Sequence, residues 1–327
     1  QVNWRFNDRS ILISGIEGQY NIVTSSIFGD RTSNGFGLYT HWEYNLSKSF
    51  LFTLGARYDY SKLDTLGLSD NIGDIIPGDI SPKIGVNYKL SKATILRASA
   101  GKGFRAPTLA EAFTSTTTSG ITVKPNPGLK SETSYSFEIG GNQSFSKFFS
   151  LDFSLFNNEY HDFIEPVIDP VDGNIVFENI TRARILGVEA SGTLSLFDKN
   201  LILKMGYTLL DSKDKETGKE LKYRPRNSFI LSGDYTLGNI KAGVDFRYNS
   251  RVEEIDNALV DFGLVPDGNE RVNIIVLDLR AGYNLIIREF PVQIFLNANN
   301  VLNYNYVEMI GNLAPIRNYS LSIDFMF

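Results

Sequence analysis

The chain has 327 residues, a formal net charge of −5 and no cysteine. The lack of cysteine excludes a disulfide framework and a thiolate metal site, and the acidic balance argues against a nucleic-acid partner. The 2 histidines lie far apart, so the common pairs of a nucleophile and a base are missing, and we expect neither an enzyme nor a cofactor. No apolar run approaches the roughly 20 residues of a membrane helix.

Alternating hydrophobicity is the main pattern along the chain. Between residues 50 and 60, large apolar side chains and Ala56 hold every second position, whereas Thr53, Gly55, Arg57 and Asp59 lie between them. Successive strand side chains point to opposite faces, so this segment predicts an amphipathic strand. The same alternation recurs in residues 36–46, 149–155, 186–196, 228–248, 275–283 and 319–327. The sequence therefore predicts an all-β fold.

The connections between these predicted strands alternate between short and long. Short turns include Leu46–Ser49 and Leu90–Ala93, and the longest polar segments are 61–79, 104–130, 213–224 and 250–270. Short turns at one rim and long loops at the other are typical of outer-membrane barrels. We count roughly fifteen strands, the first of them a stub over residues 1–6. The pattern predicts an antiparallel, up-and-down transmembrane β-barrel of about 14–15 strands whose outer face contacts lipid.

Three ordered motifs resemble those of one family. Gly101 to Phe113 contains Gly-Phe-Arg-Ala-Pro, Asn126 to Gly140 contains Asn-Pro-Gly-Leu-Lys-Ser-Glu, and Asn297 to Tyr306 precedes Pro315, Arg317 and the terminal Phe327. This set resembles the TonB-dependent outer-membrane receptors over essentially the whole chain. The resemblance implies a 22-stranded barrel closed by an N-terminal plug domain, of which residues 1–327 form the C-terminal portion without the plug.

The same resemblance carries the functional expectations. It implies uptake of a scarce ligand across the outer membrane of a Gram-negative cell, powered by the TonB complex. The ligand we expect is a ferric siderophore or a similar small-molecule metal chelate. Haem is disfavoured, because residues 108–125 contain none of the histidines that haem receptors of this family carry there. The final strand runs to the rim of short turns, which predicts a periplasmic C-terminus, and the resemblance implies that Phe327 is the signal for the barrel-assembly machinery.

Five residues in or next to the long polar segments are candidates for a ligand-facing surface. Arg105 follows Phe104 where a strand becomes a loop, and it could face the ligand or, as we favour, brace the loop. Tyr223 and two neighbouring arginines combine aromatic and cationic groups that suit an anionic chelate. The five are Arg105, Phe113, Tyr223, Arg224 and Arg226.

Charged residues inside the predicted strands lie opposite the apolar face, where they face the lumen. A cation that faced lipid at the midplane would cost about 2–4 kcal/mol. These charges could hold the plug, or they could pair across strands and line a wet channel. The candidates are Arg57, Asp59, Arg97, Glu138, Glu189, Asp245, Arg247, Asp278 and Arg280.

Two other functions fit parts of the same pattern. A self-contained passive pore of about fourteen strands would have the same alternation and would conduct ions without an energy source. A soluble β-rich binding module would bury the apolar face instead of exposing it to lipid. We expect neither a metal site nor catalytic residues in any of these cases.

Overall fold

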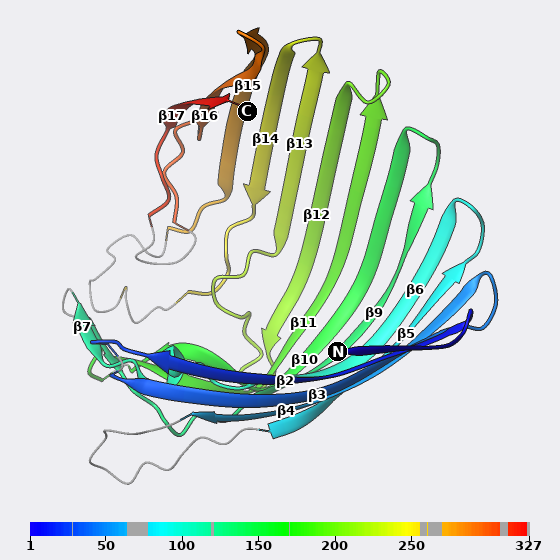
Figure 1. Cartoon of the computed structure of the whole chain (residues 1–327). Coiled ribbons are helices and arrows are strands. Elements are labelled where there is room, and N and C mark those ends of the chain that lie inside the picture. The colour runs from blue at the N-terminus through cyan, green and yellow to red at the C-terminus, as the bar shows by residue number, and fades with distance from the viewer. Residues whose placement is uncertain are drawn as a thin grey trace.

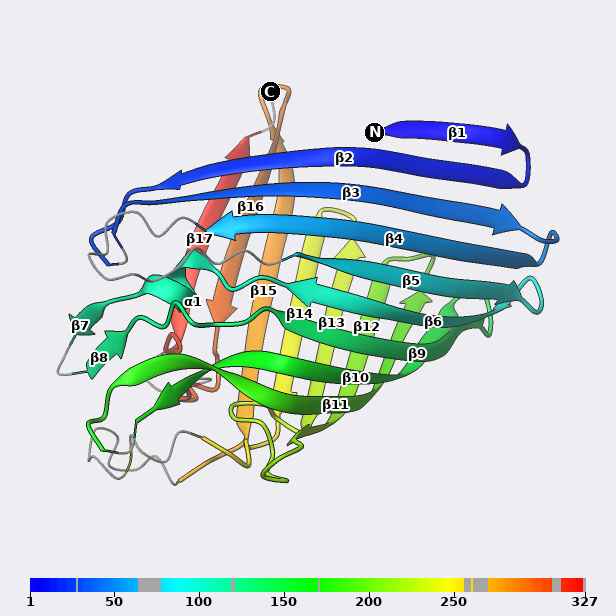
Figure 2. The same cartoon turned by 90° about the horizontal axis from the view of Figure 1, so that it is seen from below.

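The fold is one large sheet (Figures 1 and 2). The computed structural model describes residues 1–27, 29–63, 78–118, 121–169, 171–255, 260, 270–307 and 313–325. The long strands are β1 (Val2–Asn7), β2 (Ser10–Val23), β3 (Arg31–Asn45), β4 (Phe50–Leu63), β5 (Gly78–Lys89), β6 (Thr94–Arg105), β9 (Glu132–Ser144), β10 (Phe149–Ile168), β11 (Ile175–Leu196), β12 (Leu201–Asp214), β13 (Asn227–Leu237), β14 (Ile240–Asn249), β15 (Ile274–Ile287), β16 (Phe290–Asn299) and β17 (Asn318–Phe325). Between β6 and β9 lie α1 (Leu109–Phe113), β7 (Thr116–Thr118) and β8 (Ile121–Lys124).

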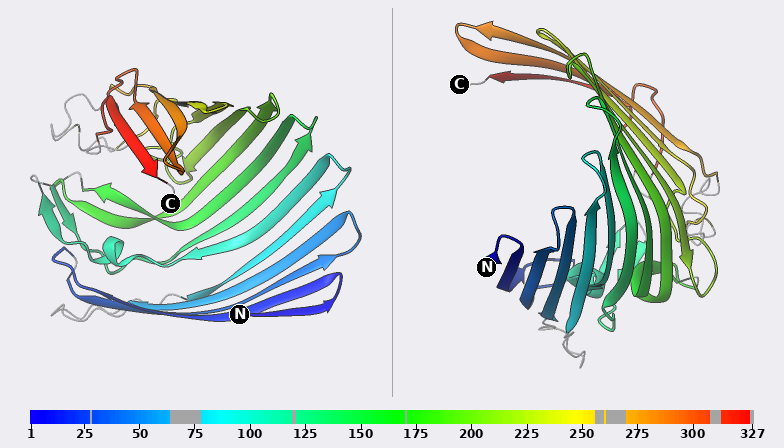
Figure 3. Two further views of the ribbon diagram at one scale, coloured as in Figure 1. Left: turned by 45° about the horizontal axis from the view of Figure 1, so that its top comes forward. Right: turned by 90° about the vertical axis from the view of Figure 1, so that its right-hand side faces the viewer.

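Each long strand pairs antiparallel with the next long strand along the chain, so the predicted up-and-down topology is confirmed. Over the residues just given the sheet has 17 strands, and without the short β7 and β8 there remain 15, in agreement with the predicted number. The stub at the start is a real strand, β1. Within the described ranges, β1 pairs only with β2 and β17 only with β16, so the curved sheet is open between these two edges (Figure 3).

The alternation of residues separates the two faces of the sheet. In register, Leu38 of β3 pairs with Tyr58 of β4, which pairs with Ile80 of β5. These three side chains are 50%, 41% and 56% exposed, so no protein layer covers this outer face. A continuous apolar face of this kind needs a partner that removes it from water, and a lipid bilayer provides one. The opposite face carries Arg57, and it is called the inner face below.

The connections divide the sheet into two ends. The turn end consists of the hairpin turns 8–9, 46–49, 90–93, 145–148, 197–200, 238–239 and 288–289. Arg288 and Glu289 have φ values of 48° and 76°, as expected for a two-residue hairpin turn in which both residues are left-handed. The loop end consists of the segments that join the opposite ends of the strands, as Figure 1 shows. The last strand, β17, runs from the loop end toward the turn end.

A small core lies at the loop end. It consists of Leu63, Ala112, Phe113, Leu129 and Ile164, with Leu109 and Phe177 packed against it. The polar segment 104–130 is therefore partly ordered by α1 and by the β7–β8 hairpin rather than being only a loop. Among the described residues, no helix has the length and hydrophobicity needed to cross a membrane.

Candidate functional site

Arg105 lies at the end of β6 and joins three segments of the loop end. Its Nε and Nη2 atoms donate to the two carboxylate oxygens of Glu132 over 2.6 and 2.7 Å, and its Nη1 atom donates to Glu111 over 2.9 Å. Glu132 also accepts the backbone N–H of Ile164 over 2.6 Å. The Glu132 side chain is only 9% exposed, and a buried carboxylate needs partners that compensate its charge. Arg105 and the backbone N–H of Ile164 provide them. Arg105 thus holds the start of β9 and the helix α1 together.

Glu111 also takes part in the N-terminal cap of α1, whose N-cap residue is Thr108. The Thr108 side chain accepts from the backbone N–H of Glu111, and the Glu111 carboxylate accepts from the backbone N–H of Thr108 over 2.8 Å. This reciprocal pair is a capping box, which orders a helix of only five residues. Burial raises the pKa of Glu111, but hydrogen bonds from Arg105 and Thr108 outweigh it, so the pKa lies below its ordinary value.

Phe113 is placed in the core rather than on a ligand-facing surface. Its side chain is 2% exposed, and the Arg31 guanidinium lies 4.7 Å from the centre of its ring. The apolar spacing of α1 explains this position, because Leu109 and Phe113 are four residues apart and share one face of the helix. In this structure the ring supports the loop end from within.

The second group of candidates comprises Tyr223, Arg224 and Arg226, of which Arg224 is held by an ion pair and Arg226 is exposed to solvent. Arg224 donates to Glu165 over 2.9 Å, and its guanidinium lies 5.4 Å from the ring centre of Phe163. Tyr223 has a φ of 58°, and its N–H donates to the carbonyl of Glu254. Arg226 is exposed, and its side chain has no hydrogen-bond or ion-pair partner among the described residues. Of the five candidates, Arg226 is the cation most open to solvent contact.

On the inner face, three arginines each lie between two carboxylates. Arg57 contacts Asp59 and Glu17, the latter over 3.1 Å. Arg97 contacts Glu138 over 3.0 Å and Asp152 over 2.8 Å. Arg280 contacts Asp234 over 2.8 Å and also Asp245. In the described part of the chain, these contacts place six of the nine charged residues predicted on this face in ion pairs, and five of the six contacts join different strands. The side chains are about one-third to one-half exposed for the most part.

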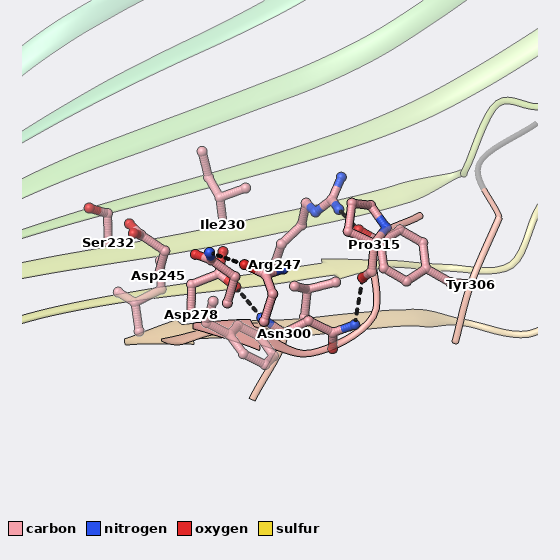
Figure 4. Close-up of a pocket in the computed structure, with 13 residues that line it drawn as sticks. Ile230, Ser232, Asp245, Arg247, Asp278, Asn300, Tyr306 and Pro315 are labelled. Atoms are coloured by element: carbon pink, nitrogen blue, oxygen red, sulfur yellow. Dashed lines mark hydrogen bonds between the residues drawn. The ribbon is translucent and has the colours of Figure 1, made fainter. Parts of the chain in front are cut away.

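The remaining inner-face candidates line hollows in the sheet. Arg247 donates to the hydroxyl of Tyr306 over 2.6 Å, and Asp278 accepts the backbone N–H of Asn300 over 2.7 Å (Figure 4). These groups line one hollow together with Asp245. Glu189 lines two other hollows, one of them with Arg97 and Asp152.

Three partners of these residues were not singled out by the sequence reasoning. The spacing Thr108-Leu-Ala-Glu111 is a readable capping signal, so Glu111 could have been found. Glu165 lies 59 positions from Arg224, and no local pattern marks it. Asn300, with a φ of 49° and 3% exposure, fixes the loop that follows β16 through Tyr304 and the carbonyl of Pro315.

The described residues contain no group of three or more His, Asp or Glu side chains placed to hold a metal ion. His41 lies 3.3 Å from Glu43, and the ring of His161 packs edge-on against Tyr135. Phe327 lies outside the described residues, as do large parts of the segments 61–79 and 250–270.

Comparison with known proteins identifies what the chain resembles. A family model described as "TonB dependent receptor-like, beta-barrel" matches residues 1–301. The chain is 28% identical over 241 residues to the ferric enterobactin receptor of Pseudomonas aeruginosa, covering 65% of this chain and 29% of that protein. It is 27% identical over 350 residues to the iron-regulated outer membrane virulence protein of Vibrio cholerae, covering 97% of this chain and 49% of that protein.

Solved structures with the same fold include the copper transporter OprC, with a TM-score of 0.77 at 17% identity over 99% of this chain and 55% of that one. The FrpB iron transporter from Neisseria meningitidis matches with a TM-score of 0.70 at 17% identity over 98% of this chain and 53% of that one. At this identity the likeness concerns the fold alone. The chain spans about half the length of these structures, and half or less of the length of the curated relatives.

Proposed function

Since this chain belongs to the family of TonB-dependent receptor β-barrels, we propose that it is the C-terminal barrel portion of an outer-membrane receptor for a ferric siderophore or a similar metal chelate. One observation carries the proposal. The sheet presents an uncovered apolar outer face and an ion-paired inner face, which is the arrangement of a wall between lipid and a wet lumen. The relatives named for ferric enterobactin and for iron regulation support an iron chelate as the ligand class.

In this proposal the loop end faces the outside of the cell, and the turn end, with the C-terminus, faces the periplasm. The ligand-facing surface comprises the segments 61–79, 104–130, 213–224 and 250–270. Arg226, exposed and adjoining one of these segments, contacts the anionic chelate directly together with Tyr223. Arg105 and Arg224 act indirectly, because their guanidinium groups are held by carboxylates and so keep the loops in place.

The inner face serves the partners that the family implies. An N-terminal plug domain would fill the lumen and would contact the charged groups there. Glu189 is exposed and lines two hollows, so it is available for such a contact. The TonB complex would act on the plug rather than on this chain. Phe327 would mark the terminal strand for the barrel-assembly machinery.

Uptake by the full-length receptor that carries this sequence tests the function. The probe is radiolabelled ferric enterobactin, offered to Gram-negative cells with and without functional TonB. We expect uptake that requires TonB. Ion conductance in a planar bilayer, together with solute entry that does not require TonB, would instead favour the passive pore.

Binding at the loop end is tested separately with Arg226→Gln. Removing the exposed cation should weaken binding of the ferric chelate about tenfold, as loss of one charge-assisted contact predicts. The matched control is Lys89→Gln, which removes an exposed cation where β5 ends at the turn end. Equal binding by wild type and Arg226→Gln would remove Arg226 from the ligand-facing surface.

A further inference from the structure

The hairpin turns carry a repeated charge that the proposed transport function does not use. Six of the seven turns at the turn end contain one cation each, and all six side chains are exposed. The three acidic residues in the same turns, Asp8, Asp198 and Glu289, form no ion pair with them among the described residues. The six cations are Arg9, Lys48, Lys92, Lys147, Lys199 and Arg288. The turn 238–239 carries none.

In three of these turns the same hydrogen bond between a serine side chain and the backbone fixes the position of the lysine. In each, a serine hydroxyl accepts the backbone N–H two residues further on, over 3.0–3.2 Å. The lysine is the residue between the acceptor and the donor, so it lies at the tip of a fixed turn. The three tips are Ser47-Lys48-Ser49, Ser91-Lys92-Ala93 and Ser146-Lys147-Phe148.

An exposed apolar side chain precedes the cation by two residues in five of the six turns. The exposed fractions of these residues are high: Leu46 58%, Leu90 57%, Phe145 61%, Phe197 68% and Ile286 76%. In the three serine turns this apolar residue, Leu46, Leu90 or Phe145, continues the outer-face positions of the strand before it, and the cation lies beyond it. Ile286 lies instead on the same face of β15 as Arg280, and Phe197 is a left-handed turn residue. Long basic side chains at such a boundary keep the stem in the apolar region and the charge in the headgroup region.

The loop end has a different charge arrangement. There, several cations are held by acids, as in Lys124–Asp172 at 2.6 Å, Arg224–Glu165 at 2.9 Å and Arg184–Asp211 at 2.6 Å. The cations of the turn end thus form a row along one rim of the sheet, and the turns with Lys48, Lys92 and Lys147 contain no acidic residue. Figure 3 shows the hairpin turns following one another along this rim. A surface of anionic headgroups is the partner whose charge and geometry match such a row.

We propose that the turn cations form a binding rim for the phosphate groups of anionic phospholipids in the leaflet that contacts the turn end. In the three serine turns Leu46, Leu90 and Phe145 insert among the acyl chains, and the lysine two residues after each of them pairs with a headgroup phosphate. The cations of the other turns add to the same rim of positive charge. This fixes the depth of the barrel wall in the bilayer. The inference rests on the proposed membrane placement, but it does not depend on which ligand is transported.

Native mass spectrometry of the full-length receptor tests the rim. The protein is equilibrated with mixed phosphatidylglycerol and phosphatidylethanolamine in detergent, and the lipids retained by the folded barrel are counted. The test variant is Lys48→Gln, Lys92→Gln and Lys147→Gln together, which leaves the serine turns intact. The matched control is Lys130→Gln, Lys215→Gln and Lys219→Gln, three exposed lysines of the loop end.

We expect wild type and control to retain more phosphatidylglycerol than phosphatidylethanolamine. In the turn variant the ratio of retained phosphatidylglycerol to phosphatidylethanolamine should fall at least tenfold. High salt should reduce the wild-type preference, because the interaction is between exposed charges. An unchanged preference in the turn variant, no preference in wild type, or an equal loss in the control would overturn the proposal. Chelate binding, measured on wild type and on the turn variant, reports on the transport function independently, because none of the turn lysines lies in a ligand-facing segment.

Discussion

Two regions of the molecule use the same charged residue types in different ways. One is the wall, which is the part of the long strands with the apolar outer face and the charged inner face, and the other is the loop end. On the wall, the Arg57 side chain is 38% exposed and its partner Glu17 is 60% exposed. At the loop end, Arg105 binds Glu132, which is 9% exposed and also accepts a backbone N–H. An exposed ion pair contributes little to stability, whereas removing a partner from a buried carboxylate leaves an uncompensated charge. The wall therefore depends on strand pairing and its apolar face, and the loop end depends on a small core and on ion pairs whose carboxylates, such as that of Glu132, are buried.

The largest effect is expected at the loop-end core. Phe113→Ala removes a side chain that is 2% exposed, and such substitutions cost about 3–5 kcal/mol. Because the core is local, the cost should appear as protease cleavage within 104–130 while the strands stay resistant. Phe145→Ala, which truncates a ring that is 61% exposed, is the control and should leave that segment protected. Equal protection of 104–130 in both variants would mean that Phe113 does not organise the loop end.

The next effect concerns the two faces of the wall. Leu231 lies on the outer face of β13, in register with Phe246, and Ser232 lies on the inner face, in register with Asp245. Leu231→Arg places a charge in lipid at a cost of about 2–4 kcal/mol, whereas Ser232→Arg gains an acidic neighbour. We expect the first variant to fail in membrane insertion and the second to insert, as measured by heat-modifiable migration of the folded barrel. Equal tolerance of both would contradict the assignment of faces.

A smaller effect is expected from pH at the loop end. The pKa of Glu111 is lowered in the folded state, so its carboxylate stabilises the fold at neutral pH. This contribution diminishes as the pH falls below the ordinary value of 4.5 and is lost below the lowered pKa. The difference in unfolding midpoint between wild type and Glu111→Gln should therefore be largest near pH 7 and should vanish on acidification. A difference that does not change with pH would indicate that the charge of Glu111 is not involved.

The smallest effect is expected for the ion pairs of the wall. Arg57→Gln removes contacts to Glu17 and Asp59, but all three side chains reach solvent. Exposed pairs of this kind contribute about 0–1 kcal/mol. Urea-induced unfolding should give nearly the wild-type midpoint, and a loss of about 3 kcal/mol or more in the free energy of unfolding, as expected for a buried pair, would show that the wall depends on its charges after all.

The difference between the wall and the loop end also explains which features can be predicted from the sequence. The strands were predictable because a period of two is local, and β4 shows it within a single segment of alternating Tyr, Arg and Asp residues. The position of Arg105 between a strand and Pro107 favours a bracing role. The contacts that the sequence does not reveal are those of Arg105 with Glu132 and of Arg224 with Glu165, which join residues 27 and 59 positions apart. Such contacts depend on how the loops pack over the sheet, which no local spacing records.

The most direct test of the membrane wall uses the absence of cysteine, since any introduced cysteine is the only one in this chain. Single cysteines at positions 228 to 236 of β13 are spin-labelled in the full-length receptor in lipid bilayers. Accessibility to oxygen, which concentrates in lipid, is then measured at each position. The account predicts alternation with a period of two, with high accessibility at Phe229, Leu231 and Tyr235 and low accessibility at Ser232 and Asp234. Uniform accessibility along β13, or the opposite alternation, would contradict it.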